Sequence, residues 1–253
     1  MGLFHFVLRP TADIQPWGEP GRYSLSWFGL SDGWYWLDLG GQELFRVREP
    51  EIATQPPYAD YQIVRLWEDL LDLLPAVLEP VPADLAQLLR TPERFLATVE
   101  RLQNDDLADE NSEGTRISEG LAFWHARHLD SGHLVAAPHL WLWRDNATVH
   151  ALWRSSTRDA KLWLPAAGYL SMPVDQFVSE LRAFDQAFLT AMGERVETLQ
   201  RSGGLAGVHI DLDQLAGEQR NRSTWLESAL LKTRTEDWEA ARQLLAPQME
   251  GPL

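Results

Sequence analysis

The stretch PVDQFVSELRAFDQAFLTAMGERVETLQRSGG, residues 173–204, has the most regular apolar pattern in the chain. Its large apolar side chains recur at spacings of three and four residues: Phe177, Leu181, Phe184, Phe188, Met192, Val196 and Leu199. Charged side chains such as Glu180 and Arg195 occupy the opposite positions. The pattern predicts one long amphipathic helix that begins at Pro173 and ends at Gly203-Gly204. Such a helix has to bury its apolar stripe, so we expect it to pack on a sheet or on other helices.

Alternating apolar patterns in the first fifty residues predict an antiparallel meander. Short turn sequences, Ser31-Asp32-Gly33 and Gly40-Gly41, separate strand-like segments that are rich in aromatic residues. We expect the turn at Asp32-Gly33 to make a hairpin of residues 27–36, and the two glycines to begin the next strand. A second β region is predicted at residues 139–144 and 148–154, around the turn Asp145-Asn146.

Between and after these strands the apolar spacing changes to three and four, which predicts further helices. We expect them at about residues 61–74, 92–103, 116–129, 212–219, 223–232 and 236–245. The fold class is therefore predicted to be α+β, with the N-terminal meander and the central hairpin packed by several amphipathic helices. We expect one domain over residues 1–253, with two packed halves, 1–115 and 116–253, as the alternative.

Composition narrows the class of protein. The 253 residues carry a formal net charge of −15 and no cysteine, so disulfides and cysteine-ligated metals are excluded. Such acidity opposes binding to nucleic acid, because that binding depends on Lys and Arg contacts to phosphates. No apolar run is long enough for a membrane span and the first residues do not resemble a secretion signal, so we expect a soluble cytoplasmic protein. The charge favours a basic protein partner, or serves solubility alone.

The aromatic string of residues 27–36 is the first candidate binding site. Packed aromatic rings beside a tight turn can form a ligand platform or anchor a protein interface. The candidate residues are Trp27, Asp32, Trp34, Tyr35 and Trp36. The alternative is that these rings are the core of their own sheet and that Asp32 only serves the turn.

The second candidate is an acidic segment, predicted to be a loop, at residues 104–114. Its carboxylates can steer a basic protein toward this surface: Asp105, Asp106, Asp109 and Glu110.

Two groups of residues can be considered as metal ligands. In an extended chain His209, Asp211 and Asp213 would share one face, which suits a divalent ion. The alternative is that Asp211 caps a helix, since Gln214 follows three residues later. A second group contains four histidines close together in sequence: His125, His128, His133 and His139. A zinc-protease motif has two histidines four residues apart with a glutamate after the first, whereas only Ala126 and Arg127 separate His125 from His128. This difference favours polar or capping roles for these histidines. We therefore expect no metal and no cofactor, with both metal groups left as alternatives.

Several short motifs resemble an uncharacterised bacterial domain family of unknown function. They are Pro16-Trp17-Gly18, the string of residues 27–36, the stretch of residues 139–144 and the tail Thr235-Glu236-Asp237-Trp238-Glu239-Ala240-Ala241-Arg242. The resemblance extends along nearly the whole chain. It implies a bacterial source and a single domain, and it brings no activity and no catalytic residue.

Three functions remain open at this point. No phosphate-binding loop and no nucleophile elbow is present in the sequence, which favours a non-enzymatic binding protein. The acidity suggests an immunity or antitoxin-like inhibitor of a basic, toxin-like protein. The alternatives are a metal-dependent hydrolase that uses the histidine and aspartate groups, and a ligand-sensing module built on the aromatic hairpin. The oligomeric state is left open.

Overall fold

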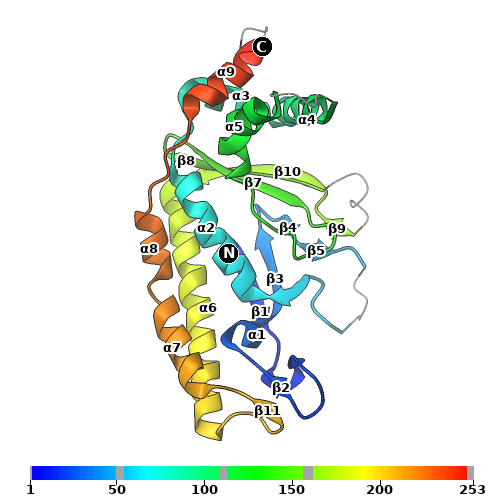
Figure 1. The fold of residues 1–253 in the computed structure, drawn as a ribbon, viewed down its shortest axis with the longest axis vertical. Coiled ribbons are helices and arrows are strands. Elements are labelled where there is room, and N and C mark those ends of the chain that lie inside the picture. The colour runs from blue at the N-terminus through cyan, green and yellow to red at the C-terminus, as the bar shows by residue number, and fades with distance from the viewer. Residues whose placement is uncertain (1, 50–53, 109–112, 156–161, 250–253) are drawn as a thin grey trace.

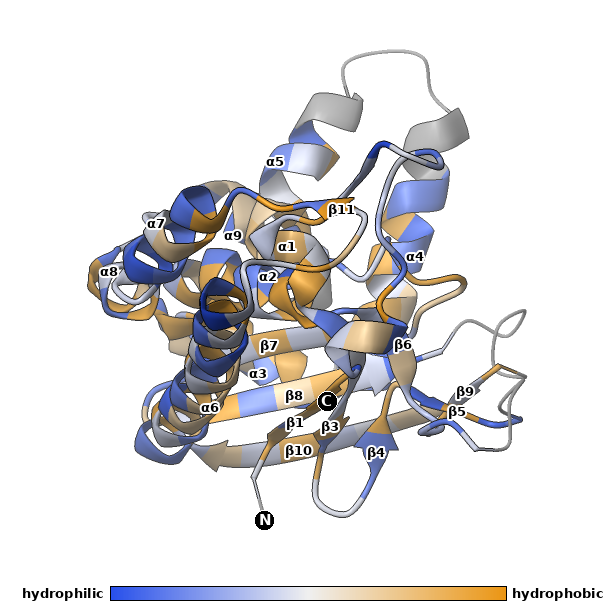
Figure 2. Ribbon diagram, turned by 90° about the horizontal axis from the view of Figure 1, so that it is seen from below, coloured by the Kyte–Doolittle hydropathy of each residue, from blue (hydrophilic) through white to orange (hydrophobic). Residues whose placement is uncertain are grey.

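The long helix is formed as predicted and spans most of the length of the molecule (Figure 1). The computed structural model describes residues 2–49, 54–108, 113–155 and 162–249. In it, α6 (Val174–Ser202) buries the seven apolar residues of the predicted stripe. Gly203 ends the helix with a φ of 73°, a conformation that a residue with a Cβ rarely adopts. Figure 2 shows hydrophilic and hydrophobic residues alternating around α6, as a helix with one buried face requires.

Strand β3 (Asp32–Asp38) is the centre of the first sheet. It pairs antiparallel with β1 (Phe4–Leu8) on one side, and with β4 (Glu43–Leu44) and β6 (Ala59–Gln62) on the other. The α6 stripe packs on this sheet, since the Phe184 ring lies 5.5 Å from the Phe4 ring and 5.8 Å from the Phe6 ring, between centroids. The first sheet and α6 thus share one hydrophobic core.

The second sheet has the antiparallel strand order β10-β8-β7, so that β7 is an edge strand. Strands β7 (His139–Asp145) and β8 (Thr148–Arg154) form the predicted central hairpin, and Asn146 at its turn has a φ of 52°. Strand β10 (Ala167–Pro173) was not predicted, because its sequence has little apolar alternation. Two small sheets complete the strands: β2 (Tyr23–Ser24) with β11 (Val208–His209), and β5 (Arg46–Val47) with β9 (Trp163–Leu164).

The remaining helices form two groups. The first group packs with α6 around the first sheet: α1 (Trp27–Leu30), α2 (Ile63–Leu78), α7 (Leu212–Arg222) and α8 (Trp225–Leu231). The second group gathers at one end of the molecule, beyond the second sheet (Figure 1): α3 (Ala83–Leu89), α4 (Pro92–Ala108), α5 (Glu113–His125) and α9 (Trp238–Met249). It encloses a smaller core that includes Trp124, Trp143 and Leu152. A short 3-10 helix at Thr11–Asp13 follows β1. The predicted α+β class is confirmed.

The predicted hairpin of residues 27–36 is wrong. Residues Trp27–Leu30 form α1, whose first turn is capped by Ser26: its Oγ accepts a hydrogen bond from the Gly29 N–H at 3.3 Å. Asp32 and Gly33 belong to β3 and form no turn. Gly33 is needed for close approach, since a Cβ there would lie 2.3 Å from the carbonyl oxygen of Val7.

Two predicted helix ends are also wrong. Helix α2 continues through Pro75 to Leu78, because Ala76 and Val77 bury apolar surface beyond the proline. Helix α4 extends to Ala108 and α5 begins at Glu113, so most of the predicted acidic loop is helical. Polar composition alone does not distinguish a loop from the solvent side of a helix. Within the described ranges no helix has the length and apolar character needed to cross a bilayer.

Candidate ligand-binding pocket

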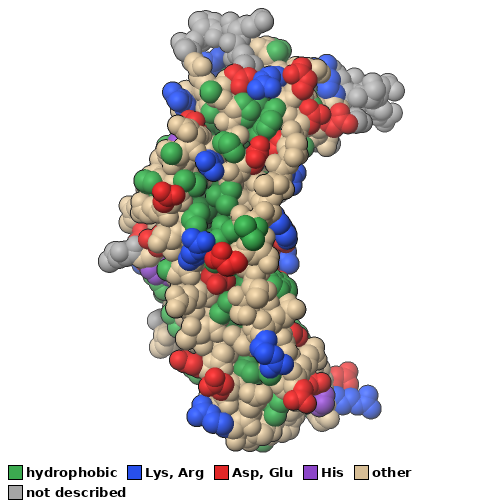
Figure 3. Space-filling view, turned by 90° about the vertical axis from the view of Figure 1, so that its left-hand side faces the viewer, with side chains coloured by type: hydrophobic (Ala, Val, Ile, Leu, Met, Phe, Trp, Pro, Cys, Tyr) green, Lys and Arg blue, Asp and Glu red, His purple; other side chains and the backbone are tan. Residues whose placement is uncertain are grey.

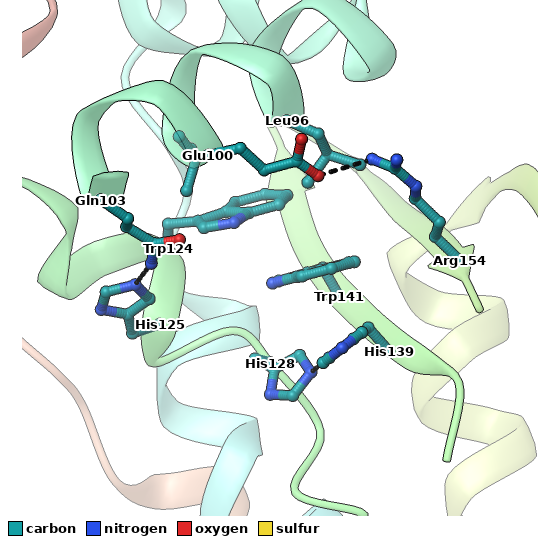
Figure 4. A pocket seen from close by; sticks show the side chains of 10 residues that line it. Leu96, Glu100, Gln103, Trp124, His125, His128, His139, Trp141 and Arg154 are labelled. Carbon is teal, nitrogen blue, oxygen red and sulfur yellow. Dashed lines mark hydrogen bonds and ion pairs between the residues drawn. The ribbon is translucent and has the colours of Figure 1, made fainter. Parts of the chain in front are cut away.

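A cavity of about 670 Å³ lies between α4, α5 and the outer side of the β7–β8 hairpin (Figure 4). Its walls come from four places in the sequence, which the second group of helices brings together over the edge strand β7. The residues that line it are Leu96, Val99, Glu100, Gln103, Trp124, His125, His128, His139, Trp141 and Arg154. The volume is in the range of sites that hold a small molecule.

Stacked rings form one wall of this pocket. Trp124 of α5 and Trp141 of β7 stack with their centroids 5.3 Å apart and their planes at 13°. The His139 ring continues the stack, 5.4 Å from the Trp141 ring. His139 and Trp141 are two residues apart on one strand and therefore project from the same face of the sheet. Trp124 is buried and Trp141 only partly so, which leaves an aromatic surface toward the cavity.

The histidines of the pocket are hydrogen-bonded. The His128 Nε2 lies 2.9 Å from the His139 Nδ1, and the His125 Nε2 lies 3.1 Å from the Gln103 Nε2 (Figure 4). Burial first, and the His139 ring next, lower the pKa of His128 to about 4. Burial also lowers the pKa of His125. These two imidazoles are therefore neutral near pH 7, and each has one donor and one acceptor nitrogen.

An ion pair closes the rim of the pocket. Arg154 Nη1 of β8 lies 2.9 Å from Glu100 Oε1 of α4, and both side chains are about half exposed. The pair joins the second sheet to α4, and its two opposite charges neutralise each other. The lining of this cavity is consequently close to neutral, although the chain is strongly acidic.

A second, acidic cavity adjoins the first. It measures about 260 Å³, and His125 and His128 line both cavities. Its other polar walls are Arg65, Asp69, Asp72 and Asp130. Arg65 Nη2 lies 3.1 Å from Asp69 Oδ1 and 3.6 Å from Asp130 Oδ2, so one guanidinium contacts two carboxyl groups.

Asp69 is the buried carboxyl group of this acidic cavity, with a side chain only 6% exposed. Burial raises its pKa to about 7, Arg65 opposes the rise, and the nearby carboxylates of Asp130, Glu68 and Asp72 add to it. Its Oδ2 has no hydrogen-bond partner among the described residues and lies 3.9 Å from His133 Nδ1. The other ring nitrogen of His133 is 2.7 Å from the Tyr35 hydroxyl.

The predicted aromatic residues lie elsewhere and are used in packing. Trp27, Trp34 and Tyr35 are buried, and the half-buried Trp36 lies between Tyr58 and His5, at 3.9 and 5.0 Å between ring centroids. Asp32 accepts a hydrogen bond from Arg9 Nε at 2.7 Å. None of the five lines the pocket of Figure 4. Whether any of them binds a ligand stays a prediction.

The predicted acidic residues are only partly covered by the structure. Asp105 and Asp106 lie in the last turns of α4, and Asp109 and Glu110 lie outside the described residues. The backbone of α4 places the first two beyond Gln103, at the end of the helix that lines the pocket.

The structure gives the candidate metal ligands other roles. Asp211 is the N-cap of α7, and its Oδ1 accepts a hydrogen bond from the Gln214 N–H at 2.9 Å, as the capping interpretation expects. Among residues 2–49, 54–108, 113–155 and 162–249 no three His, Asp or Glu side chains are arranged to hold a metal ion. His125, His128 and His139 do meet, but as walls of one pocket, while His133 bonds to Tyr35.

Sequence reasoning missed Trp124, Trp141, Glu100 and Arg154 as site residues. The alternation His139-Leu140-Trp141 indicated that two amphipathic rings share a strand face, whereas the contribution of α4 depends on tertiary packing.

A family model matches residues 3–244, and its description is "Family of unknown function (DUF5984)". This match confirms the resemblance to a family of unknown function. No curated protein and no solved structure matches the chain.

Proposed function

The chain belongs to DUF5984, and because the function of that family is unknown, we propose from the pocket geometry that the protein is a non-enzymatic binding protein for a planar small molecule. The observation that supports this most is the aromatic wall of Trp124, Trp141 and His139 in a cavity of about 670 Å³. A flat ring can pack against the accessible edges of this stack, and the neutral imidazoles of His125 and His128 offer hydrogen bonds to it.

The composition of the pocket favours binding over catalysis. Among the described residues that line it there is no Ser, Thr, Cys, Lys or Tyr, so these residues supply no usual nucleophile apart from one carboxylate and the imidazoles. The one carboxylate, Glu100, is paired with Arg154. A hydrolytic reaction would need an activated nucleophile or a water held by a base, whereas His128 bonds to His139 and His125 bonds to Gln103.

Trp141→Ala tests the proposal. Saturation-transfer NMR against a library of planar heteroaromatic compounds should find ligands of the wild-type protein, and Trp141→Ala should weaken their binding about tenfold, since a stacking contact contributes about 1 kcal/mol or more. Trp36→Ala is the matched control, because Trp36 is also a half-buried, stacked tryptophan but lies outside the pocket. Equal weakening by both variants, or a library without any ligand, would refute the proposal.

A second candidate function is inhibition of a basic protein in the manner of an immunity protein, within the cytoplasm. The net charge of −15 supports it, because negative potential accelerates association with a cationic partner. On the face shown in Figure 3, acidic and basic side chains are interspersed, so the charges there are not segregated. Pull-down at low and high salt, with Asp105, Asp106, Asp109 and Glu110 neutralised together, tests this candidate. It fails if no cationic protein is recovered, or if recovery at low salt is the same without these four charges.

A further inference from the structure

The segment of residues 130–138 carries a buried histidine, His133, that does not line the pocket. The segment connects His128 to His139, which are both walls of the pocket. The side chain of His133 is 10% exposed, and its Nε2 lies 2.7 Å from the Tyr35 hydroxyl of β3. His133 therefore anchors the segment to the first sheet.

Two buried polar atoms face each other on the other side of the His133 ring. Nδ1 of His133 lies 3.9 Å from Oδ2 of Asp69 on α2, and neither atom has a hydrogen-bond partner among the residues that the structure describes. The gap exceeds a hydrogen bond by about 1 Å, which a small rotation of either side chain closes. Arg65 Nη2 lies 3.1 Å from the other oxygen, Oδ1, and this leaves Oδ2 for His133. A carboxyl oxygen and an imidazole nitrogen form a hydrogen bond only when one of the two carries the hydrogen.

The direction of the hydrogen bonds along Tyr35, His133 and Asp69 depends on one proton. When Asp69 holds this proton, its Oδ2–H donates to Nδ1, and the ring hydrogen of His133, on Nε2, donates to the Tyr35 oxygen. When one proton has left to solvent, the ring hydrogen is on Nδ1 and donates to Oδ2, while the Tyr35 hydroxyl donates to Nε2. Each state gives a partner to both ring nitrogens and to Oδ2, as buried polar atoms require.

The surroundings of the pair decide where the proton resides. Burial, opposed by Arg65, raises the pKa of Asp69 to about 7, whereas burial lowers the pKa of His133 and Arg65 lowers it further. Burial also raises the pKa of Tyr35, so its hydroxyl keeps its hydrogen. Below about pH 7 the proton therefore belongs to Asp69 rather than to His133. The titratable and charged side chains that face the pair come from α2, β3, β6 and residues 125–130: Arg65, Glu68, Asp72, Tyr35, Tyr61, His125, His128 and Asp130.

We propose that Tyr35, His133 and Asp69 form a buried, proton-operated switch: one proton decides which ring nitrogen of His133 carries the hydrogen and reverses both hydrogen bonds of the ring. Both states hold the ring at its two nitrogens, so the segment of residues 130–138 stays anchored while its hydrogen bonds invert. The switch responds to pH near neutrality. It is independent of what the neighbouring pocket binds.

Two-bond 1H–15N NMR of the imidazole rings tests the proposal, because it distinguishes a ring nitrogen that carries a hydrogen from one that does not. Over a titration from about pH 5 to about pH 9, we expect the hydrogen of His133 to move from Nε2 to Nδ1. The midpoint should lie at about 7, the pKa of Asp69. His133→Gln identifies the signals of this ring among those of the seven histidines.

Asp69→Asn should hold the hydrogen on Nε2 at every pH. Arg65 keeps the amide oxygen at the place of Oδ1, so the amide nitrogen takes the place of Oδ2 and donates to Nδ1. Asp72→Asn is the matched control: it removes the same charge from α2, and Asp72 has no contact with His133 among the described residues. It should keep the switch and lower its midpoint, because one negative charge near Asp69 is lost.

Three results would overturn the proposal. One is a wild-type His133 that keeps its hydrogen on the same nitrogen throughout the titration. Another is a ring with hydrogens on both nitrogens at the acidic end, which would place the proton on His133 instead of Asp69. The third is a change of nitrogen that persists in Asp69→Asn. The first two come from the wild-type protein alone, so the proposal stays testable even if the variant does not fold.

Discussion

Two aromatic strands of this protein, β3 and β7, have similar sequences but different surroundings. β3 contains Trp34-Tyr35-Trp36 and β7 contains Trp141-Leu142-Trp143. β3 has hydrogen-bonded neighbours on both sides, and other side chains cover its rings: the guanidinium of Arg9 lies 4.3 Å from the Trp34 ring centroid. β7 pairs with β8 on one side, and on the other side it has only short backbone bridges to residues 127–129 and to Val81. Helices cover its outer face in part, and its rings change from buried at Trp143 to partly exposed at Trp141. The side chains that pack over each ring, rather than the composition of its strand, decide which aromatic surface lines a cavity.

The largest expected effect separates a core tryptophan from a pocket tryptophan. Trp27 is fully buried, its Nε1–H donates to Gln219 Oε1 at 2.9 Å, and its ring packs on Phe188. Trp27→Ala should therefore lower the free energy of unfolding by about 3–5 kcal/mol. Trp141→Ala, at a partly exposed ring, should cost only about 1–2 kcal/mol. Urea denaturation of both variants measures this, and equal losses would contradict the contrast between the two aromatic regions.

The parts of the fold with local signals were predictable, and those that depend on distant pairing were not. The α6 stripe and the β7–β8 turn follow from periodicity and from Asn146, which adopts a positive φ. The short helix α1 and the central place of β3 depend on partners far away in sequence, β1 and β6. For the pocket, three of its histidines were considered from sequence as metal ligands, with polar or capping roles favoured. Their meeting with Trp124 and Arg154 follows from helix packing, which no local pattern encodes.

The next expected effect concerns the helices that build the pocket. Arg127, which follows α5, is fully buried; its Nη1 donates to Glu236 Oε1 at 2.9 Å and its Nη2 to the carbonyl oxygen of Glu79 at 3.0 Å. This ion pair ties the end of α5 to the segment before α9. Arg127→Met leaves Glu236 buried next to one remaining cation, Arg234, and should cost about 3 kcal/mol.

Thermal denaturation of three variants tests this role of the ion pair. The double variant Arg127→Met with Glu236→Met should recover most of the stability lost in Arg127→Met, because replacing both charges avoids an unpaired buried group. Phe188→Ala serves as a reference variant, because it lowers stability in the larger core and leaves this ion pair intact. A double variant as unstable as Arg127→Met would show that the buried arginine acts through packing alone.

The smallest expected effect is a pH dependence that has opposite signs in the two adjoining cavities. The pKa of His128 is lowered from 6.5 to about 4, so between these values the unfolded chain binds a proton that the folded protein does not. Its contribution therefore makes the protein less stable as the pH falls from 6.5 to 4. The pKa of Asp69 is raised from 3.8 to about 7, so the folded protein holds the extra proton, and this contribution makes the protein less stable as the pH rises from 3.8 to 7.

These two contributions partly cancel in the wild-type protein, and variants separate them. The stability of wild type minus that of His128→Gln should increase by about 1–2 kcal/mol from pH 4 to pH 7, a value reduced for the partial exposure of the ring. The same difference for Asp69→Asn should decrease over that range. Urea denaturation at a series of pH values measures both slopes, and His5→Gln, an exchange at a histidine outside both cavities, is the control. Slopes of the same sign would contradict the opposite pKa shifts of His128 and Asp69.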